Sequence, residues 1–99
     1  MLKKRQEIKW TLDSEVIVNH IKYDRDSVWY STRGHFRIRS MDYLYLISVL
    51  KVVTKFLSGH SISNEEQIQA IQKNHVTVNL MHILKTEVYY RNLINKQNE

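Results

Sequence analysis

The spacing of apolar residues changes once along this chain, close to residue 40. Before that point apolar and polar residues alternate, as in "STRGHFRIRS" (31–40), where Phe36 and Ile38 stand between basic residues. Alternation is typical of a β-strand with one buried face. After that point apolar residues recur at three- and four-residue intervals, which is typical of amphipathic helices. Strands followed by helices predict an α+β fold.

Residues 7–40 predict an antiparallel sheet, in the form of a four-stranded meander. The expected strands are rich in β-branched and aromatic residues and are separated by turn residues. They cover residues 7–12, 15–23, 28–32 and 35–40. The side chains expected on the buried face are those of Ile8, Trp10, Leu12, Ile17, Ile21, Trp29, Phe36 and Ile38.

Turn lengths fix the pairing that we expect between these strands. A two-residue turn at Arg33-Gly34 would place Trp29 opposite Ile38. A three-residue loop at 24–26 would place Ile21 opposite Trp29 in the same sheet.

Residues 41–96 predict two or three helices that pack on one face of the sheet. We expect a first helix over 41–58, capped by Ser40 and stopped by Gly59, on the face that carries Trp10, Trp29 and Phe36. A second is expected over 64–73, with Ser63 and Glu66 as a capping box, and a third over 78–96 after Thr77. Residues 75–80 also alternate like a strand, so the sequence leaves strand and helix start open there.

Length and composition favour one small basic domain. The 99 residues suffice for a single core, and the charged residues 1–6 are expected to fray. A net charge of +5 favours an acidic or polyanionic partner. Abundant Lys, Ile and Asn, with no proline and two glycines, suggest an AT-rich bacterial genome, or a phage or mobile element of such a host.

The sequence predicts a cytoplasmic protein without a membrane segment. The most apolar run, "MDYLYLISVLKVVTKFL", is interrupted by Lys51 and Lys55, and the first ten residues lack the apolar stretch of a signal peptide. Cysteine is absent, which excludes disulfides, thiolate metal sites and cysteine nucleophiles.

Motifs for catalysis or metal binding are also missing from the sequence. His75 and His82 are seven residues apart, and no further ligand completes a metal pattern. Asp24 and Asp26 lie in an expected turn, where aspartates usually bind their own backbone. We therefore expect no enzyme activity, no metal and no cofactor.

The exposed face of the predicted sheet is the candidate binding surface, and we expect almost no acidic residue on it. Its candidate binding residues are Lys9, Lys22, Tyr30, His35, Arg37 and Arg39. Lysine and arginine neutralise phosphates while an aromatic ring stacks on a base, so this set predicts binding of the DNA or RNA phosphate backbone.

Two other interpretations of the same face stay open. The first is a protein–protein interaction module, such as a small phage-type inhibitor or adaptor that docks on an acidic surface of a larger enzyme. Val16, Val18 and Val28, expected on the same face, favour this interpretation. The second is an ordinary solvated sheet face, whose basic residues prevent aggregation through an edge strand.

Overall fold

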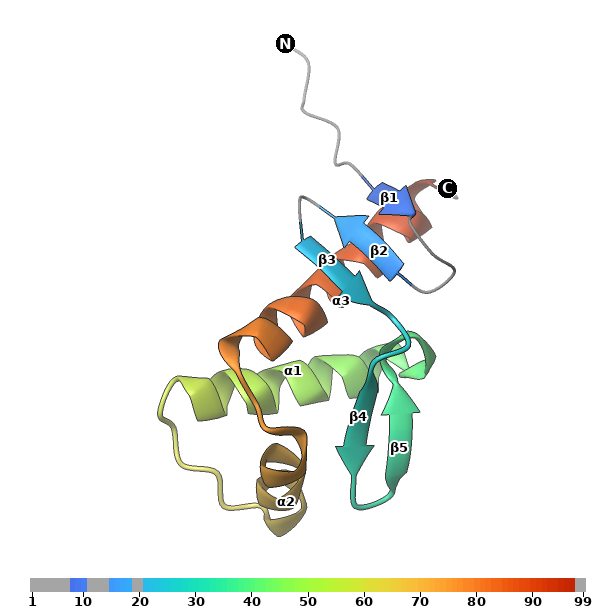
Figure 1. The fold of residues 1–99 in the computed structure, drawn as a ribbon. Coiled ribbons are helices and arrows are strands. Elements are labelled where there is room, and N and C mark those ends of the chain that lie inside the picture. The colour runs from blue at the N-terminus through green and yellow to red at the C-terminus, as the bar shows by residue number, and fades with distance from the viewer. Residues whose placement is uncertain (1–7, 11–14, 19–20, 98–99) are drawn as a thin grey trace.

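The computed structural model describes residues 8–10, 15–18 and 21–97, and side chains for residues 17–18 and 21–95. Figure 1 shows strands first and helices after them along the chain, which confirms the α+β class. The strands are β1 (Ile8–Trp10), β2 (Glu15–Val18), β3 (Ile21–Asp24), β4 (Val28–Ser31) and β5 (Gly34–Arg37). A short 3-10 helix, η1 (Ile38–Ser40), precedes α1 (Tyr43–Leu57), α2 (Glu65–Asn74) and α3 (Val78–Gln97).

The described strands form two antiparallel sheets, so the prediction of a single four-stranded meander is wrong. One sheet has the order β1-β2-β3, and the other is the β4–β5 hairpin. The expected pairing of Ile21 with Trp29 does not occur, because Ile21 pairs with Val18 and Trp29 pairs with Phe36, and a tight turn joins β3 to β4. In that turn the Asp24 carboxylate accepts a hydrogen bond from the Asp26 N–H at 2.8 Å, and the Asp24 carbonyl accepts one from Ser27.

The strand expected over 15–23 is in fact two paired strands. Val18 lies opposite Ile21, and Ile17 lies opposite Lys22. Residues that pair across strands share a face, so Val18 lies on the buried side with Tyr23, and their exposed fractions are 1% and 4%. The prediction that Val18 is exposed and Ile17 buried is wrong, because it assumed one continuous strand over 15–23.

The β4–β5 hairpin buries the side chains that were predicted for it. Trp29 lies opposite Phe36 and is 3% exposed, and Ile38 is 2% exposed. Ser31 pairs with Gly34, so the two turn residues are Thr32 and Arg33 rather than Arg33 and Gly34. The predicted register is therefore wrong by two residues, and a shift of two leaves every side chain on its expected face.

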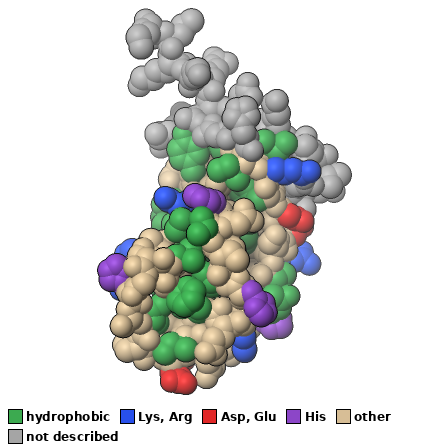
Figure 2. Space-filling model, turned by 60° about the vertical axis from the view of Figure 1, so that its left-hand side comes forward, with side chains coloured by type: hydrophobic (Ala, Val, Ile, Leu, Met, Phe, Trp, Pro, Cys, Tyr) green, Lys and Arg blue, Asp and Glu red, His purple; other side chains and the backbone are tan. Residues whose placement is uncertain are grey.

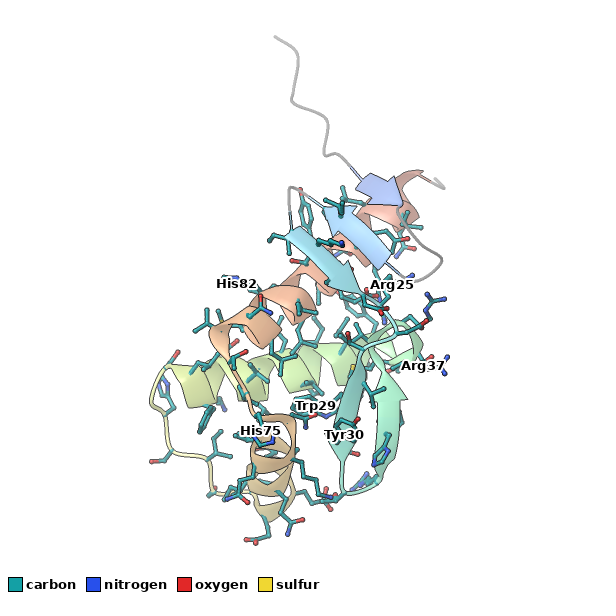
Figure 3. The ribbon with its side chains drawn as sticks, viewed as in Figure 1. Arg25, Trp29, Tyr30, Arg37, His75 and His82 are labelled. Atoms are coloured by element: carbon teal, nitrogen blue, oxygen red, sulfur yellow. The ribbon has the colours of Figure 1, made fainter. Side chains whose placement is uncertain are left out.

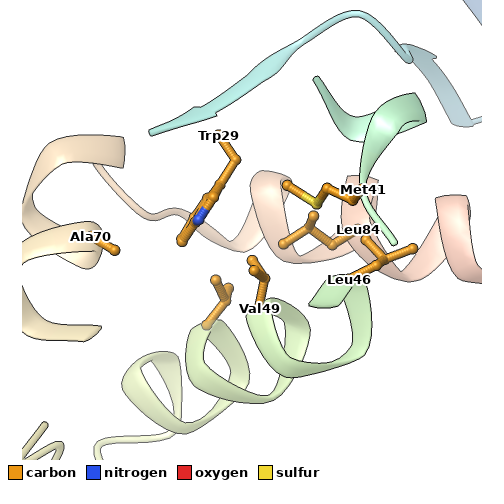
Figure 4. Close-up of a cluster of buried hydrophobic side chains, with 7 residues drawn as sticks. Trp29, Met41, Leu46, Val49, Ala70 and Leu84 are labelled. Atoms are coloured by element: carbon orange, nitrogen blue, oxygen red, sulfur yellow. The ribbon is translucent and has the colours of Figure 1, made fainter. Parts of the chain in front are cut away.

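The main hydrophobic core lies where the hairpin meets the three helices. Trp29 packs there with Met41, which directly follows η1, and with side chains from all three α-helices; Figure 4 shows this cluster. The cluster comprises Trp29, Met41, Leu46, Val49, Val53, Ala70 and Leu84. The expected packing of the first helix on Trp29 and Phe36 is confirmed, whereas the side chain of Trp10 lies outside the described residues.

Helix α1 begins two residues later than the sequence predicted. Asp42 is its N-cap instead of Ser40, because η1 occupies Ile38–Ser40. Its predicted end is confirmed: Gly59 has a φ of 81°, and the N–H of His60 donates to the carbonyl of Lys55 at 3.0 Å. This is the Schellman arrangement that glycine favours.

The caps of the other two helices are partly as expected. Asn64, not Ser63, caps α2, and its side chain accepts from the Gln67 N–H at 3.0 Å. Thr77 caps α3 as predicted by accepting from the Leu80 N–H at 3.2 Å. Residues 75–80, for which the sequence favoured neither a strand nor a helix start, therefore contain the start of α3. Of the helices in the described residues, none is long and apolar enough to cross a membrane.

Candidate binding surface on the hairpin

Three of the six predicted binding residues come together on the outer face of the β4–β5 hairpin. Tyr30 lies opposite His35, and their ring centroids are 4.6 Å apart in an edge-to-face arrangement. Arg37 lies opposite Val28 on the same face. Tyr30 and Val28 are 42% and 39% exposed, and Figure 3 labels Tyr30 and Arg37 on the two strands. We call these four residues the hairpin ladder.

The charge of this surface is smaller than the sequence suggested. Arg39 follows β5 in η1, and its Nε lies 2.6 Å from an oxygen of Asp26. The expectation of a nearly acid-free face is therefore wrong at Asp26. At the turn, Arg33 lies 3.6 Å from Glu66, and both side chains are largely exposed. Arg37 has no acidic partner among the described residues.

The two lysines of the predicted set belong to the other sheet. The register places Lys9 opposite Ile17, and Ile17 opposite Lys22. Asp24 follows Lys22 by two residues in β3 and so shares its face. The side chain of Lys9 lies outside the described residues. The candidate residues thus do not form one continuous basic face.

At the outer edge of β4, a side chain from α2 pairs with the backbone, a contact that was not predicted from the sequence. The Asn74 amide accepts from the Tyr30 N–H at 2.8 Å and donates to the Tyr30 carbonyl at 2.7 Å. The same amide nitrogen donates to the Ala70 carbonyl within α2 at 2.7 Å. Asn74 therefore satisfies the outward backbone groups of Tyr30, with which a further strand would otherwise pair.

A buried ionic network, which was not predicted from the sequence, surrounds Glu87. Glu87 in α3 is 0% exposed and accepts hydrogen bonds from Tyr23 at 2.9 Å, from Arg25 at 2.8 and 2.9 Å, and from Arg91 at 2.6 Å. Burial alone would raise the pKa of the Glu87 carboxyl, but the hydrogen bonds from Arg25 and Arg91 outweigh it and lower this pKa below its ordinary value. Glu87 therefore stays ionised at neutral pH.

This network ties the end of β3 and the segment around η1 to α3. Arg91 also donates to the carbonyls of Ile38 and Met41, at 2.8 and 2.7 Å. Arg25 lies over the ring of Tyr90, 4.6 Å from its centroid. Since the carboxylate of Glu87 is engaged by four donor groups, it is poorly placed to act as a general base. A helical stripe that contains Glu87 and Arg91 between apolar residues was the sequence signal for it.

Hydrophobic exposure extends beyond the hairpin ladder. Figure 2, which brings the left-hand side of Figure 1 forward, shows a run of hydrophobic side chains with histidines on either side of it. On the helices, Leu44 is 74% exposed, Val78 54% and Phe56 45%. Apolar exposure alone therefore does not distinguish the hairpin ladder; its combination of Tyr30, Val28 and Arg37 does.

No arrangement for metal binding is present in the described part of the chain, which contains no cluster of three histidine or carboxylate side chains that could hold an ion. A cleft of about 230 Å³ lies between α1, α2 and the hairpin, and it is lined by Trp29, Arg33 and Glu66 among others. Its two charged residues pair with each other. Comparison of the chain with protein-family models, with curated proteins and with solved structures found no match.

Proposed function

We propose that this protein is a non-enzymatic binding protein that docks on an acidic surface of a larger protein through the hairpin ladder. The observation that carries the proposal is Val28 beside Arg37 on an exposed face that also presents Tyr30. Tyrosine and arginine are enriched at protein interfaces, and they dominate binding where aliphatic neighbours exclude water.

The charge of the chain supports an acidic partner. The net charge is +5, and Arg37 has no acidic neighbour among the described residues. Complementary charge would speed the encounter and exclude basic surfaces. A small inhibitor or adaptor from a phage or mobile element fits this size and composition, and that assignment is part of the proposal.

Nucleic-acid binding is the second candidate, and the exposed pair of Tyr30 and His35 beside Arg37 favours it. An exposed ring can stack on an unpaired base, and the neighbouring arginine can neutralise a phosphate. The ladder holds one arginine, because Arg39 pairs with Asp26 and Lys22 lies on the other sheet. We rank this candidate second because few phosphates would be neutralised and Val28 would gain little from them.

Site-specific photo-crosslinking in the producing cell tests the two candidates. A crosslinking amino acid replaces Tyr30, and a matched control replaces Thr54 on the exposed side of α1. We expect a nuclease-resistant adduct with one acidic protein from position 30 and none from position 54. Nuclease-sensitive adducts from position 30 would establish the second candidate instead. Identical adducts from both positions would refute the hairpin as the binding surface.

A further inference from the structure

The free edge of β5 has a definite hydrogen-bonding geometry. In an antiparallel pair, successive residues point their N–H and C=O groups alternately toward and away from the partner strand. The Ile38 N–H donates to the Ser27 carbonyl at 2.9 Å, whereas the N–H and C=O of Tyr30 point away from β5, toward Asn74. His35 and Arg37 lie opposite Tyr30 and Val28 in the same alternation. Their N–H and C=O groups therefore point away from β4, to the outer edge of β5.

The two edges of the hairpin differ in whether their backbone groups have a hydrogen-bonding partner. Asn74 closes the edge of β4 by pairing with both backbone groups of Tyr30. Among the described strands, β5 has β4 as its sole neighbour, and Figure 1 shows β5 on the outside of the hairpin. No side chain in the described part of the chain closes this second edge as Asn74 closes the first. An open edge next to a closed one is a template for an added strand.

We propose that the edge of β5 binds an extended acidic segment of the partner protein as an additional antiparallel or parallel strand. This inference rests on the proposed function and specifies the form of the partner. The backbone groups of His35 and Arg37 would supply main-chain hydrogen bonds, which give affinity without regard to sequence. The exposed side chain of Arg37 would select carboxylates at alternate positions of the added strand.

The charge of the edge also argues against a second copy of the chain as the occupant. Two β5 strands that paired with each other would bring two copies of Arg37, which has no acidic partner among the described residues, close together. Like charges on paired strands are destabilising, so an acidic segment is favoured over self-association.

The probe for this inference is a synthetic peptide of alternating glutamate and valine, titrated into isotopically labelled protein and followed by NMR. The matched probe has lysine in place of glutamate. We expect the acidic peptide alone to bind, to shift the amide resonances of His35 and Arg37, and to slow their hydrogen exchange. The amide of Phe36, which points toward β4, should change less in its exchange rate.

Two substitutions of Arg37 separate the contribution of its side-chain charge to binding from that of its backbone N–H. Arg37→Gln keeps the edge N–H, and Arg37→Pro removes it; the φ of Arg37 is −69°, close to the value that proline requires. We expect Arg37→Gln to weaken binding about fivefold through the lost charge pair. We expect Arg37→Pro to weaken it by about a further fivefold through the lost hydrogen bond. Lys51→Gln, an equal charge change on exposed α1, should have little effect.

Several results would overturn the inference. Absence of binding by the acidic peptide would do so, as would equal affinities of Arg37→Gln and Arg37→Pro, or unchanged exchange at His35 and Arg37 in the bound wild type. The exchange measurement needs no variant, so it decides the matter even if Arg37→Pro folds poorly. If position 30 still crosslinks an acidic protein while the edge amides stay unprotected, strand addition fails and the proposed function survives.

Discussion

Glu87→Gln tests the buried network that joins the N-terminal sheet to α3. The substitution preserves size but removes the charge that compensates Arg25 and Arg91, whose side chains are 18% and 17% exposed. It also turns an amide N–H₂ toward arginine donors, so at least one arginine N–H loses its acceptor. Breaking a buried ion pair from one side costs about 3–5 kcal/mol. We expect a loss of that size in the free energy of unfolding at neutral pH.

The pH dependence of this loss distinguishes a charge effect from a packing effect. The folded state holds the pKa of Glu87 below its ordinary value, because the arginine hydrogen bonds outweigh the cost of burial. The stabilisation is therefore complete above the unfolded pKa of about 4.3 and is lost as the pH falls through the folded pKa. The difference between wild type and Glu87→Gln should stay constant near neutrality and narrow in acid.

Urea unfolding followed by tryptophan fluorescence, to which Trp10 and the buried Trp29 contribute, measures this difference at several pH values. The matched control is Glu66→Gln, because Glu66 is paired with Arg33 at 3.6 Å but its side chain is 58% exposed. An exposed pair contributes at most about 1 kcal/mol, so the control should stay close to wild type. A difference below about 1 kcal/mol for Glu87→Gln, or one that does not change with pH, would refute the ionic account.

Four further predictions concern the core, the hairpin edge, DNA binding and metal binding. Trp29→Ala should cost about 3–5 kcal/mol in urea unfolding, because the ring is 3% exposed in the main core; wild-type stability would contradict this packing. Asn74→Ala should speed hydrogen exchange at the Tyr30 amide and cost about 1–2 kcal/mol, and unchanged exchange would show that the edge is closed in another way. If the second candidate function is correct, the logarithm of DNA affinity should fall with the logarithm of salt at a slope of about −1, and Arg37→Ala should flatten it. Tag-free protein should hold no stoichiometric transition metal, and metal analysis that finds one on His75 or His82 would refute this.

Local sequence patterns predicted the fold class and much of the hairpin. The alternation around Trp29 and Phe36 fixed which side chains are buried, even though the predicted turn was one residue too late and the pairing register was off by two. Gly59 and Thr77 predicted a helix end and a helix start because glycine and threonine act there through their own backbone or hydroxyl group. These features depend on residues that are close in sequence.

The features that sequence patterns missed depend on residues far apart in the chain. The division into two sheets is set by the turn at Asp24 and by the docking of β3 on α3, where Tyr23 meets Glu87. An isolated glutamate in a helix suggests a solvent-exposed position, and its burial becomes favourable when Arg25, from the turn after β3, joins Arg91 in binding the carboxylate. The predicted basic residues do not form one face for the same reason. Lys9 and Lys22 belong to the first sheet, Arg37 to the hairpin and Arg39 to η1.

Hydrogen–deuterium exchange of the free protein and of its complex with the crosslinked partner, purified without the crosslink, tests the central claim most directly. The claim is that the hairpin is the binding surface, so we expect protection on binding to concentrate in residues 28–37, with the amides of His35 and Arg37 among the most protected. The exposed apolar side chains of the helices, including Leu44, Phe56 and Val78, mark the competing surface. Protection confined to α1 and the start of α3, with the hairpin unchanged, would contradict the account.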